Sequence, residues 1–461
     1  MDQTRAHPSH SPSGQCGPAL PLARWAGRQL QAMAHDHGLP ALAALSGAAL
    51  MGERGSNNGY TINGRISAGL GGSRLLKTRD GGWFALTLIR DVDRELLPAL
   101  FCDAGFDGSV EGAIGAAAAR FDCAELVERG RALGLPVASA DEVPVTPAVE
   151  VLMQGQNRGR GPTASYGNFA ASPARPELVE GRWRSAGADT LRRAQDERRW
   201  GKFPAQFSGH RLSGHRPLVI DLSAIWAGPL AGHLFWQAGM EVVKVESRSR
   251  PDLIRRDDPA TFDLINQGKA NVLVDFASER EKAALIALIR RADVVIESSR
   301  PRALKHLGID AEALVREVPG LVWLSVTGHG ARGEAANWVG IGNDCGVAGG
   351  LSRAMAELTG EIGFVGDAVA DPLTGITAAR EGLAALRSGM AQRIGLSMSA
   401  IAAMALAEER AHDRAAIDAE LRAWGSSIGA PFPHVPRRAL QAEVRAIGAD
   451  TARYLPELAP C

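Results

Sequence analysis

The feature that most constrains the fold is an alternation of short apolar strands with helices that starts at Pro217. The expected strands are PLVIDLS, EVVKVES, NVLVDF, DVVIESS and LVWLSVTGHG, and the helices between and beside them include GPLAGHLFWQAGM, EREKAALIALIRRA and AEALVREV. Strands that alternate with helices in this way predict an α/β fold with a mostly parallel sheet covered on both faces. Such folds bind ligands at the carboxyl ends of their strands.

The part of the chain before this alternation has a different character. Apolar residues recur at helical spacing between Ala23 and Met51, and Leu75 to Ile89 reads as a β-hairpin around the turn Arg79-Asp80-Gly81-Gly82. Three short helices follow. We predict a disordered tail over 1–20, a small α+β domain over 21–150, a largely disordered Arg/Gly/Ser-rich linker over 151–215, and a Rossmann-like large domain with a C-terminal tail over 216–461.

Charge and cysteine content narrow the function classes. Lys plus Arg and Asp plus Glu are both 51, so the net charge is zero and no global field holds nucleic acid or an anionic membrane. The opening residues are polar, without the apolar core of a signal peptide, and the apolar run at 40–52 is too short to span a bilayer. Five cysteines without a C-x-x-C pair argue against disulfides and a zinc knuckle. We expect a cytoplasmic protein with no nucleic-acid or membrane partner.

The first strand-to-helix turn, residues 221–229, is where such a fold would cradle a phosphate. It reads DLSAIWAGP, with one glycine, and lacks the G-x-G-x-x-G pattern that a dinucleotide requires. A nicotinamide or flavin dinucleotide is therefore disfavoured. Free N–H groups at the helix start still suit an anion or a thioester oxygen.

Several ordered blocks resemble the signature segments of the family III CoA-transferases, which include formyl-CoA transferase, carnitine CoA-transferase and α-methylacyl-CoA racemase. The blocks are LVIDLSAIWAGPLAGHLFWQAGMEVVKVES, INQGKANVLVDF, RRADVVIESSRPRALKHLGID, LVWLSVTGHGARG, VADPLTGITAAREGLAALRSG and PRRALQAEVRAIGADTARYLPEL. SAGLGGSRLLKTRDGGWFALTL resembles the small domain of that family, but here it precedes the large domain. The fold implied is the family's own in rearranged order. The front half either completes that fold or is a degenerate duplicate.

The resemblance implies an acyl-CoA:carboxylate CoA-transferase acting through an aspartyl-CoA thioester. It implies that the nucleophile is Asp371, directly before the helix ITAAREGLAAL. From the residues alone, Asp before Pro at a helix start also fits an N-cap, and the flanking blocks favour the nucleophile. Asp367 is the nearest competitor and is expected in the preceding loop. Gly69, Gly71 and Gly72 match the glycine-rich loop that closes over the catalytic Asp, or they form an ordinary flexible loop.

Coenzyme A is the implied co-substrate, together with an acyl-CoA donor and a carboxylic acid acceptor. No metal and no redox cofactor is implied, and a homodimer is expected. The positions carried over for CoA contacts are Trp226, Ala227, Gly228, Lys244, Arg248, Lys269, Ser298, Ser299, Arg300 and His306. Ser299 and His306 depart from the residues usual in the family, and each cation alone also fits a solvated surface charge.

Three alternatives remain open: an acyl-CoA racemase or isomerase, a catalytically inactive CoA-binding homologue, and a purely structural or interaction protein. The racemase branch uses His before Asp, where this chain has Asn343 before Asp344. An amide does not exchange a proton near neutral pH, so racemisation by that route is disfavoured. His329 is expected in a loop or at a sheet end, and Cys345 in buried packing.

Overall fold

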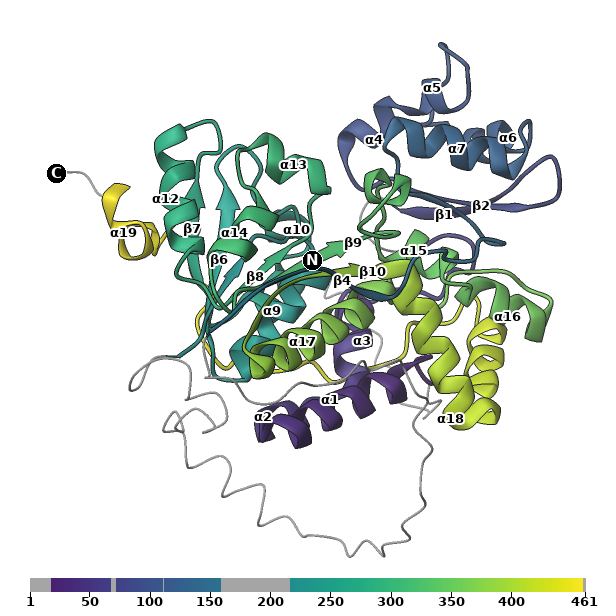
Figure 1. Ribbon diagram of the computed structural model, residues 1–461. Helices are drawn as coiled ribbons and strands as arrows, with labels where there is room; N and C mark the ends of the chain where they lie inside the picture. The colour runs from purple at the N-terminus through teal and green to yellow at the C-terminus, as the bar shows by residue number, and fades with distance from the viewer. Residues whose placement is uncertain (1–17, 68–71, 111, 159–215, 459–461) are drawn as a thin grey trace, which may run out of the picture.

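The computed structural model describes residues 18–67, 72–110, 112–158 and 216–458 (Figure 1). Its centre is a seven-stranded sheet in the order β4-β10-β9-β8-β5-β6-β7. The strands are β4 (Val149–Asn157), β5 (Leu218–Asp221), β6 (Glu241–Ser247), β7 (Ala270–Val274), β8 (Val294–Glu297), β9 (Val322–Thr327) and β10 (Met390–Ser397). All neighbours pair in parallel except β4, which pairs antiparallel with β10. The α/β class and the mostly parallel sheet predicted from the sequence are confirmed.

Each face of this sheet has its own hydrophobic core. Successive strand residues alternate between the cores: Val219 belongs to one and Ile220 to the other. The first face is covered by α9 (Ala227–Gln237), α17 (Ala370–Ser388) and α18 (Met398–Ser426), and the second by α12 (Glu279–Ile289) and α14 (Ala311–Glu317). Near-continuous apolar strands such as β9 follow from this burial on both sides.

The first helices of the chain pack into the large core. They are α1 (Ala23–His37), α2 (Pro40–Ala43) and α3 (Gly47–Asn57), and Figure 1 shows α1 beneath α17. Trp25 and Leu50 belong to the same buried cluster as Leu373 of α17. Trp25 Nε1 donates to Glu408 of α18 at 2.7 Å. These helices, which the predicted domain over 21–150 includes, therefore share a core with the large half.

A separate small module is formed by residues 73–140. It holds an antiparallel sheet of β1 (Ser73–Lys77), β2 (Trp83–Thr87) and β3 (Val137–Ser139), with the helices α4 (Asp91–Glu95), α5 (Leu97–Leu100), α6 (Ala113–Ala118) and α7 (Cys123–Leu133). The β1–β2 hairpin turns through Asp80 and Gly81 (φ 82°), as the sequence predicts. One face of the sheet packs on the module's own helices, and Leu75 on the other face packs against Ala348 of α15 (Gly342–Ala348).

The sequence predicts a linker from residue 151, but the edge strand β4 continues to Asn157. Its side chains are half-exposed or exposed along its length, because an edge strand with few covering groups leaves them in water. The polar run QGQN therefore forms strand. The remaining linker residues, 159–215, lie outside the described residues, as does the predicted tail up to residue 17.

The other described elements complete the large half. They are α10 (Ile254–Asp257), α11 (Pro259–Asn266), α13 (Pro301–His306), η2 (Glu334–Asn337), α16 (Leu351–Thr359), α19 (Thr451–Tyr454) and η3 (Pro456–Leu458). Within the described ranges, no helix combines the length and the apolar character needed to cross a bilayer.

Candidate active site

Three helix N-termini converge on the side chain of Asp371. Asp371 is the second residue of α17, and its carboxylate accepts the backbone N–H of Ala227 and of Gly342, the first residues of α9 and α15. Unpaired N–H groups and the positive ends of helix dipoles stabilise an anion at such a point. The carboxylate is buried, with only 5% of the residue exposed. The residue is not the N-cap, because α17 begins at Ala370 with Val369 as its N-cap, so Asp371 lies inside the helix and not before it. Its carboxylate binds the starts of two other helices.

Burial nevertheless works against the charge on Asp371. Desolvation is the largest effect and raises the pKa of Asp371 to about 7, and the nearby Asp367 raises it further. Arg54 and the N–H groups of Ala227 and Gly342 lower it. A carboxylate balanced between these effects is desolvated yet available in ionised form near neutral pH, which suits a nucleophile.

Gly342 leaves the space in which the Asp371 carboxylate sits. A Cβ at position 342 would lie 2.1 Å from Asp371 Oδ2 and 2.5 Å from the Ala368 carbonyl oxygen. Ala368 itself has φ 47°, a left-handed conformation that is strained for alanine. The turn before α17 and the start of α15 are therefore fitted to one another around this side chain.

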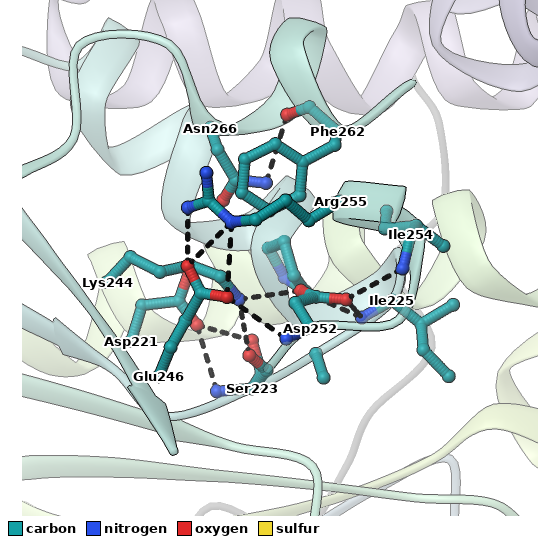
Figure 2. A network of polar contacts seen from close by, with 12 residues as sticks. Asp221, Ser223, Ile225, Lys244, Glu246, Asp252, Ile254, Arg255, Phe262 and Asn266 are labelled. Atoms are coloured by element: carbon teal, nitrogen blue, oxygen red, sulfur yellow. Dashed lines mark hydrogen bonds and ion pairs between the residues drawn. The ribbon is translucent and has the colours of Figure 1, made fainter. Parts of the chain in front are cut away.

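A buried ionic network shapes the turn that carries Ala227 (Figure 2). Ile225 has φ 70°, and its N–H donates to Asp252 Oδ1 at 3.1 Å. Lys244 Nζ bonds both Asp252 Oδ2 at 2.9 Å and the Ser223 carbonyl at 2.6 Å. Asp221 accepts the N–H of Ser223 at 3.0 Å. The strained turn is held from several sides, which fixes the Ala227 N–H against Asp371.

This network accounts for two of the cations expected to bind CoA. Lys244 and Lys269 are both buried, and Lys269 Nζ lies 2.8 Å from Asp221 Oδ2 and 2.8 Å from the Pro229 carbonyl. Burial lowers the pKa of Lys269 to about 8, partly offset by Asp221. Both ammonium groups are engaged inside the protein, an arrangement that favours a structural role over phosphate binding. Arg248, by contrast, is exposed and pairs with Glu281 at 3.6 Å.

A cation from the front of the chain faces the same site. Arg54 on α3 is buried, and its guanidinium lies over the rings of Trp226 at 5.1 Å and Tyr60 at 5.9 Å. Arg54 Nε is 3.3 Å from Asp367 Oδ2 and 3.7 Å from Asp258 Oδ2. Asp367 lies in the turn before α17, as predicted for it.

The segment that carries the predicted glycine loop is anchored beside Asp371. Asn343 donates from its amide to Ser67 Oγ at 2.9 Å and to Ser73 Oγ at 3.0 Å, and its Oδ1 accepts the Ala368 N–H at 3.0 Å. Ser67 and Ser73 flank the loop. Gly72 adopts φ 70°, whereas Gly69 and Gly71 lie outside the described residues. The Asn343 amide is occupied by structural hydrogen bonds.

A second buried group lies next to Asp371. His329, just after β9, has Nε2 at 3.9 Å from Asp344 Oδ2, and the ligand atoms of His329, Asp344 and Cys345 all lie within 4.8 Å of one another. Burial lowers the pKa of His329 to about 3 and raises that of Asp344 to about 7. The Cys345 thiol donates to the Gly328 carbonyl at 3.4 Å. Burial and near neighbours thus favour the uncharged form of all three.

A cleft of about 1330 Å³ separates the small module from the large half. Arg300 and His306 line it from α13 and its N-cap, together with Arg302, while Arg131 and Glu142 line it from the module. Its wall includes Trp338, which Arg131 covers at 3.7 Å and His329 contacts edge-on at 5.9 Å. The site containing His329 and Asp344 therefore lies behind the cleft wall.

The remaining predicted CoA positions lie at the start of α9 and after β8. Trp226, Ala227 and Gly228 start α9 beside Asp371, and a Cβ at Gly228 would lie 2.2 Å from Ser223 Oγ. Ser298 is exposed and accepts the Ala224 N–H at 3.2 Å, while Ser299 donates to Glu297 at 3.3 Å.

Sequence reasoning passed over Arg54, because a single Arg on an amphipathic helix carries no signal until its partners are known.

The fold thus places a buried carboxylate where the starts of three helices converge. A sequence model described as CoA-transferase family III matches residues 212–453, more than half of the chain. The chain belongs to CoA-transferase family III.

Individual relatives match over shorter stretches. The succinate–glutarate CoA-transferase of Agrobacterium fabrum is 32% identical over 215 residues, 43% of this chain and 53% of the relative. A protein of Mycobacterium tuberculosis named "Probable fatty acyl-CoA transferase" is 31% identical over 203 residues, 41% and 51% of the two chains. The crystal structure of a CAIB/BAIF family protein from Brucella suis is 30% identical, with a TM-score of 0.40 over 44% of this chain and 57% of that one. The matched part thus spans about half the length of these relatives.

Proposed function

We propose that the protein is an acyl-CoA:carboxylate CoA-transferase in which Asp371 is the nucleophile. The observation that carries the proposal is a buried carboxylate, with its pKa raised to about 7, that accepts N–H groups from two helix N-termini. Family membership supplies the reaction class, and the geometry supplies a desolvated oxygen nucleophile held in one orientation.

The chemistry is a sequence of acyl exchanges at Asp371. A carboxylate oxygen attacks the thioester carbonyl carbon, the C–S bond breaks, and an aspartyl–acyl anhydride forms with release of CoA thiolate. The thiolate attacks the Asp371 carbonyl carbon, which releases the first carboxylic acid as its anion and leaves an aspartyl-CoA thioester. The acceptor carboxylate then repeats both steps in reverse, which regenerates the Asp371 carboxylate. Each step exchanges one acyl bond for another, so no electron acceptor is consumed.

Backbone N–H groups stabilise the charge that develops on oxygen. The donors at the starts of α9 and α15 are two of these groups, and the loop that contains Gly69, Gly71 and Gly72 completes the set in this proposal. Preorganised donors of this kind lower the barrier because they need no reorientation as the tetrahedral oxyanion forms.

Coenzyme A occupies the cleft between the two halves in this proposal. Arg300, Arg302, His306 and Arg131 line it and can meet phosphate groups, since guanidinium groups bind phosphate through paired hydrogen bonds. Its volume of about 1330 Å³ exceeds the roughly 300–1000 Å³ of ordinary small-molecule sites. The pantetheine arm would pass the Trp338 wall to bring the thioester to Asp371.

The front half completes the fold in this proposal. β4 extends the central sheet, α1 and α3 share its core, and Asn343 ties the segment around the glycine loop to the turn before Asp371. A rearranged order of the family's two halves accounts for this better than a degenerate duplicate. We retain a cytoplasmic homodimer as the assembly to be tested.

The test traps the intermediate on the full-length protein. The protein is mixed with a panel of acyl-CoAs and acids that starts with succinyl-CoA and glutarate, and hydroxylamine is added. We expect a hydroxamate on residue 371, found by peptide mass spectrometry, and its absence from D371N. E357Q, which makes the same carboxylate-to-amide change at an exposed position of α16, serves as the control. Undiminished CoA exchange by D371N, or exchange of solvent deuterium into the acyl α-carbon without transfer, would overturn the proposal.

A further inference from the structure

We propose that Arg54 is a positioning residue for Asp371, which keeps that side chain ionised and fixed inside the buried site. Arg54 comes from α3, outside residues 212–453 that match the family. The inference rests on the proposed function, because it assigns a role within the same site.

The guanidinium of Arg54 lies over two aromatic rings. Its Cζ is 5.1 Å from the centroid of Trp226 and 5.9 Å from that of Tyr60, and a hydrogen bond joins Arg54 to Tyr60. Stacking of a guanidinium on aromatic faces fixes its place while leaving its edge free for anions. Trp226 directly precedes Ala227, whose N–H binds Asp371, so the same turn orients Arg54 and the carboxylate.

Negative charge dominates the surroundings of Arg54. Asp367 and Asp258 lie within 3.7 Å of Arg54 Nε, and the Arg54 charge acts on Asp371 as well. The titratable groups that face Asp371 are Arg54 from α3, Asp367 from the preceding turn, and Asp344 and Cys345 from α15, with His329 beyond Asp344. The positive charge of Arg54 therefore offsets the negative charge of a group of acids.

Arg54 interacts with its acidic neighbours through charge more than through paired hydrogen bonds. Within the described part of the chain, Arg54 Nε and both Asp367 carboxylate oxygens have no hydrogen-bond partner. Arg54 Nε and Asp367 Oδ2 form an ion pair at 3.3 Å without hydrogen-bond geometry, and buried polar atoms are nearly always hydrogen-bonded, so this contact calls for an explanation. A purely structural pair would form the bidentate fork that Arg and carboxylate favour. A guanidinium whose charge is shared among Asp367, Asp258 and Asp371 explains the open geometry.

The test follows the ionisation of Asp371 without substrate. Dicyclohexylcarbodiimide modifies protonated carboxyl groups in apolar sites, and peptide mass spectrometry reports its rate at residue 371 as a function of pH. Relative to the wild type, we expect R54M to move the midpoint upward, by up to about 1–3 pH units, and R54K to move it less, because the Arg54 charge lowers the pKa of Asp371 and an opposite charge near a carboxyl group lowers its pKa by up to that amount. D367N removes a like charge and should move the midpoint downward.

These opposite shifts separate positioning from a structural role. A structural pair would lower the unfolding temperature of R54M and D367N alike without moving the midpoint in opposite directions. An unchanged midpoint in R54M, or a downward one, would overturn the inference. If R54M does not fold, R54M/D367N is compared with D367N alone, and the same upward shift is required.

The labelling test of Arg54 and the hydroxamate test of the proposed reaction can fail separately. If the midpoint moves as expected but no hydroxamate forms on residue 371 with any acyl-CoA, the positioning role stands and the transferase proposal falls. If the hydroxamate forms and R54M leaves the midpoint in place, the reverse holds. In an active protein, the acid limb of the kcat/KM profile should move together with the labelling midpoint.

Discussion

A methyl group added at Gly342 should disable Asp371 while leaving the fold standing. The new Cβ in G342A would lie 2.1 Å from Asp371 Oδ2 and 2.5 Å from the Ala368 carbonyl oxygen, where ordinary contacts are 3.4–4 Å. Both contacts must open, the one to the carboxylate by more than 1 Å and the one to the carbonyl by about 0.9 Å. The carboxylate is the freer of the two, because the Ala368 carbonyl belongs to backbone whose N–H is bonded to Asn343.

We expect G342A to lower both the stability and the rate of CoA exchange, by amounts that can be measured separately. Overpacking of this size costs about 1–3 kcal/mol of stability, which a large domain survives. Displacement of a reacting group by ~1 Å costs about 100-fold in rate, so CoA exchange should fall by that factor or more. Thermal unfolding and hydroxamate formation on residue 371 measure the two effects on the same preparation.

The matched control is G346A in the same helix. A Cβ at Gly346 would meet Leu351 at 3.6 Å and Val369 at 3.8 Å, both ordinary contacts. Alanine is favoured over glycine in a helix by about 1 kcal/mol, so G346A should be as stable as the wild type or more stable, and fully active. Full hydroxamate formation in G342A, or equal losses in both variants, would refute the reasoning that Asp371 acts from its position in the structure.

Three further predictions test the buried charges and the joining of the two halves. K269M should lower the free energy of unfolding by about 3–5 kcal/mol, because it leaves Asp221 buried without its partner, whereas R248M, at the surface, should change it by less than about 1 kcal/mol in urea titrations. Folding favours the protonated form of Asp344, because its pKa rises from 3.8 to about 7 in the folded protein. The free energy of unfolding should therefore be highest below about pH 4 and fall as the pH rises through 7. D344N should flatten that fall, and an unchanged slope would contradict the prediction. A protease site placed between residues 160 and 214 should, after cleavage, leave residues 18–157 and 216–458 together on gel filtration, and their separation in native buffer would count against the shared core.

Local chemistry allowed much of the fold to be predicted. The parallel sheet follows from apolar strand runs between helices, and the β1–β2 hairpin from the turn residues Asp80 and Gly81. The sheet and the hairpin depend on neighbours within a few residues, which the sequence displays directly. Asp371 could be proposed only through the resemblance to the family's blocks, because the residues around it also fit an N-cap, and the structure places it in a buried polar cradle.

Features that depend on distant partners could not be predicted. β4 looks like linker, because an edge strand needs no apolar alternation and its partner β10 lies more than 200 residues away. Lys244 and Lys269 look like surface cations, since nothing local reveals that Asp252 and Asp221 meet them inside the fold. The role of Arg54 depends on three acids and two rings from separate segments.

The pairing of β4 with β10 also dictates the order of events during synthesis. Val149 lies opposite Leu396, so a nine-residue strand leaves the ribosome long before its partner exists. Until then, its unpaired backbone can join any other strand edge in the cell. Slow closure of so long a loop makes the nascent front half a substrate for chaperones, and variants that delay β10 should increase aggregation before they affect the finished protein.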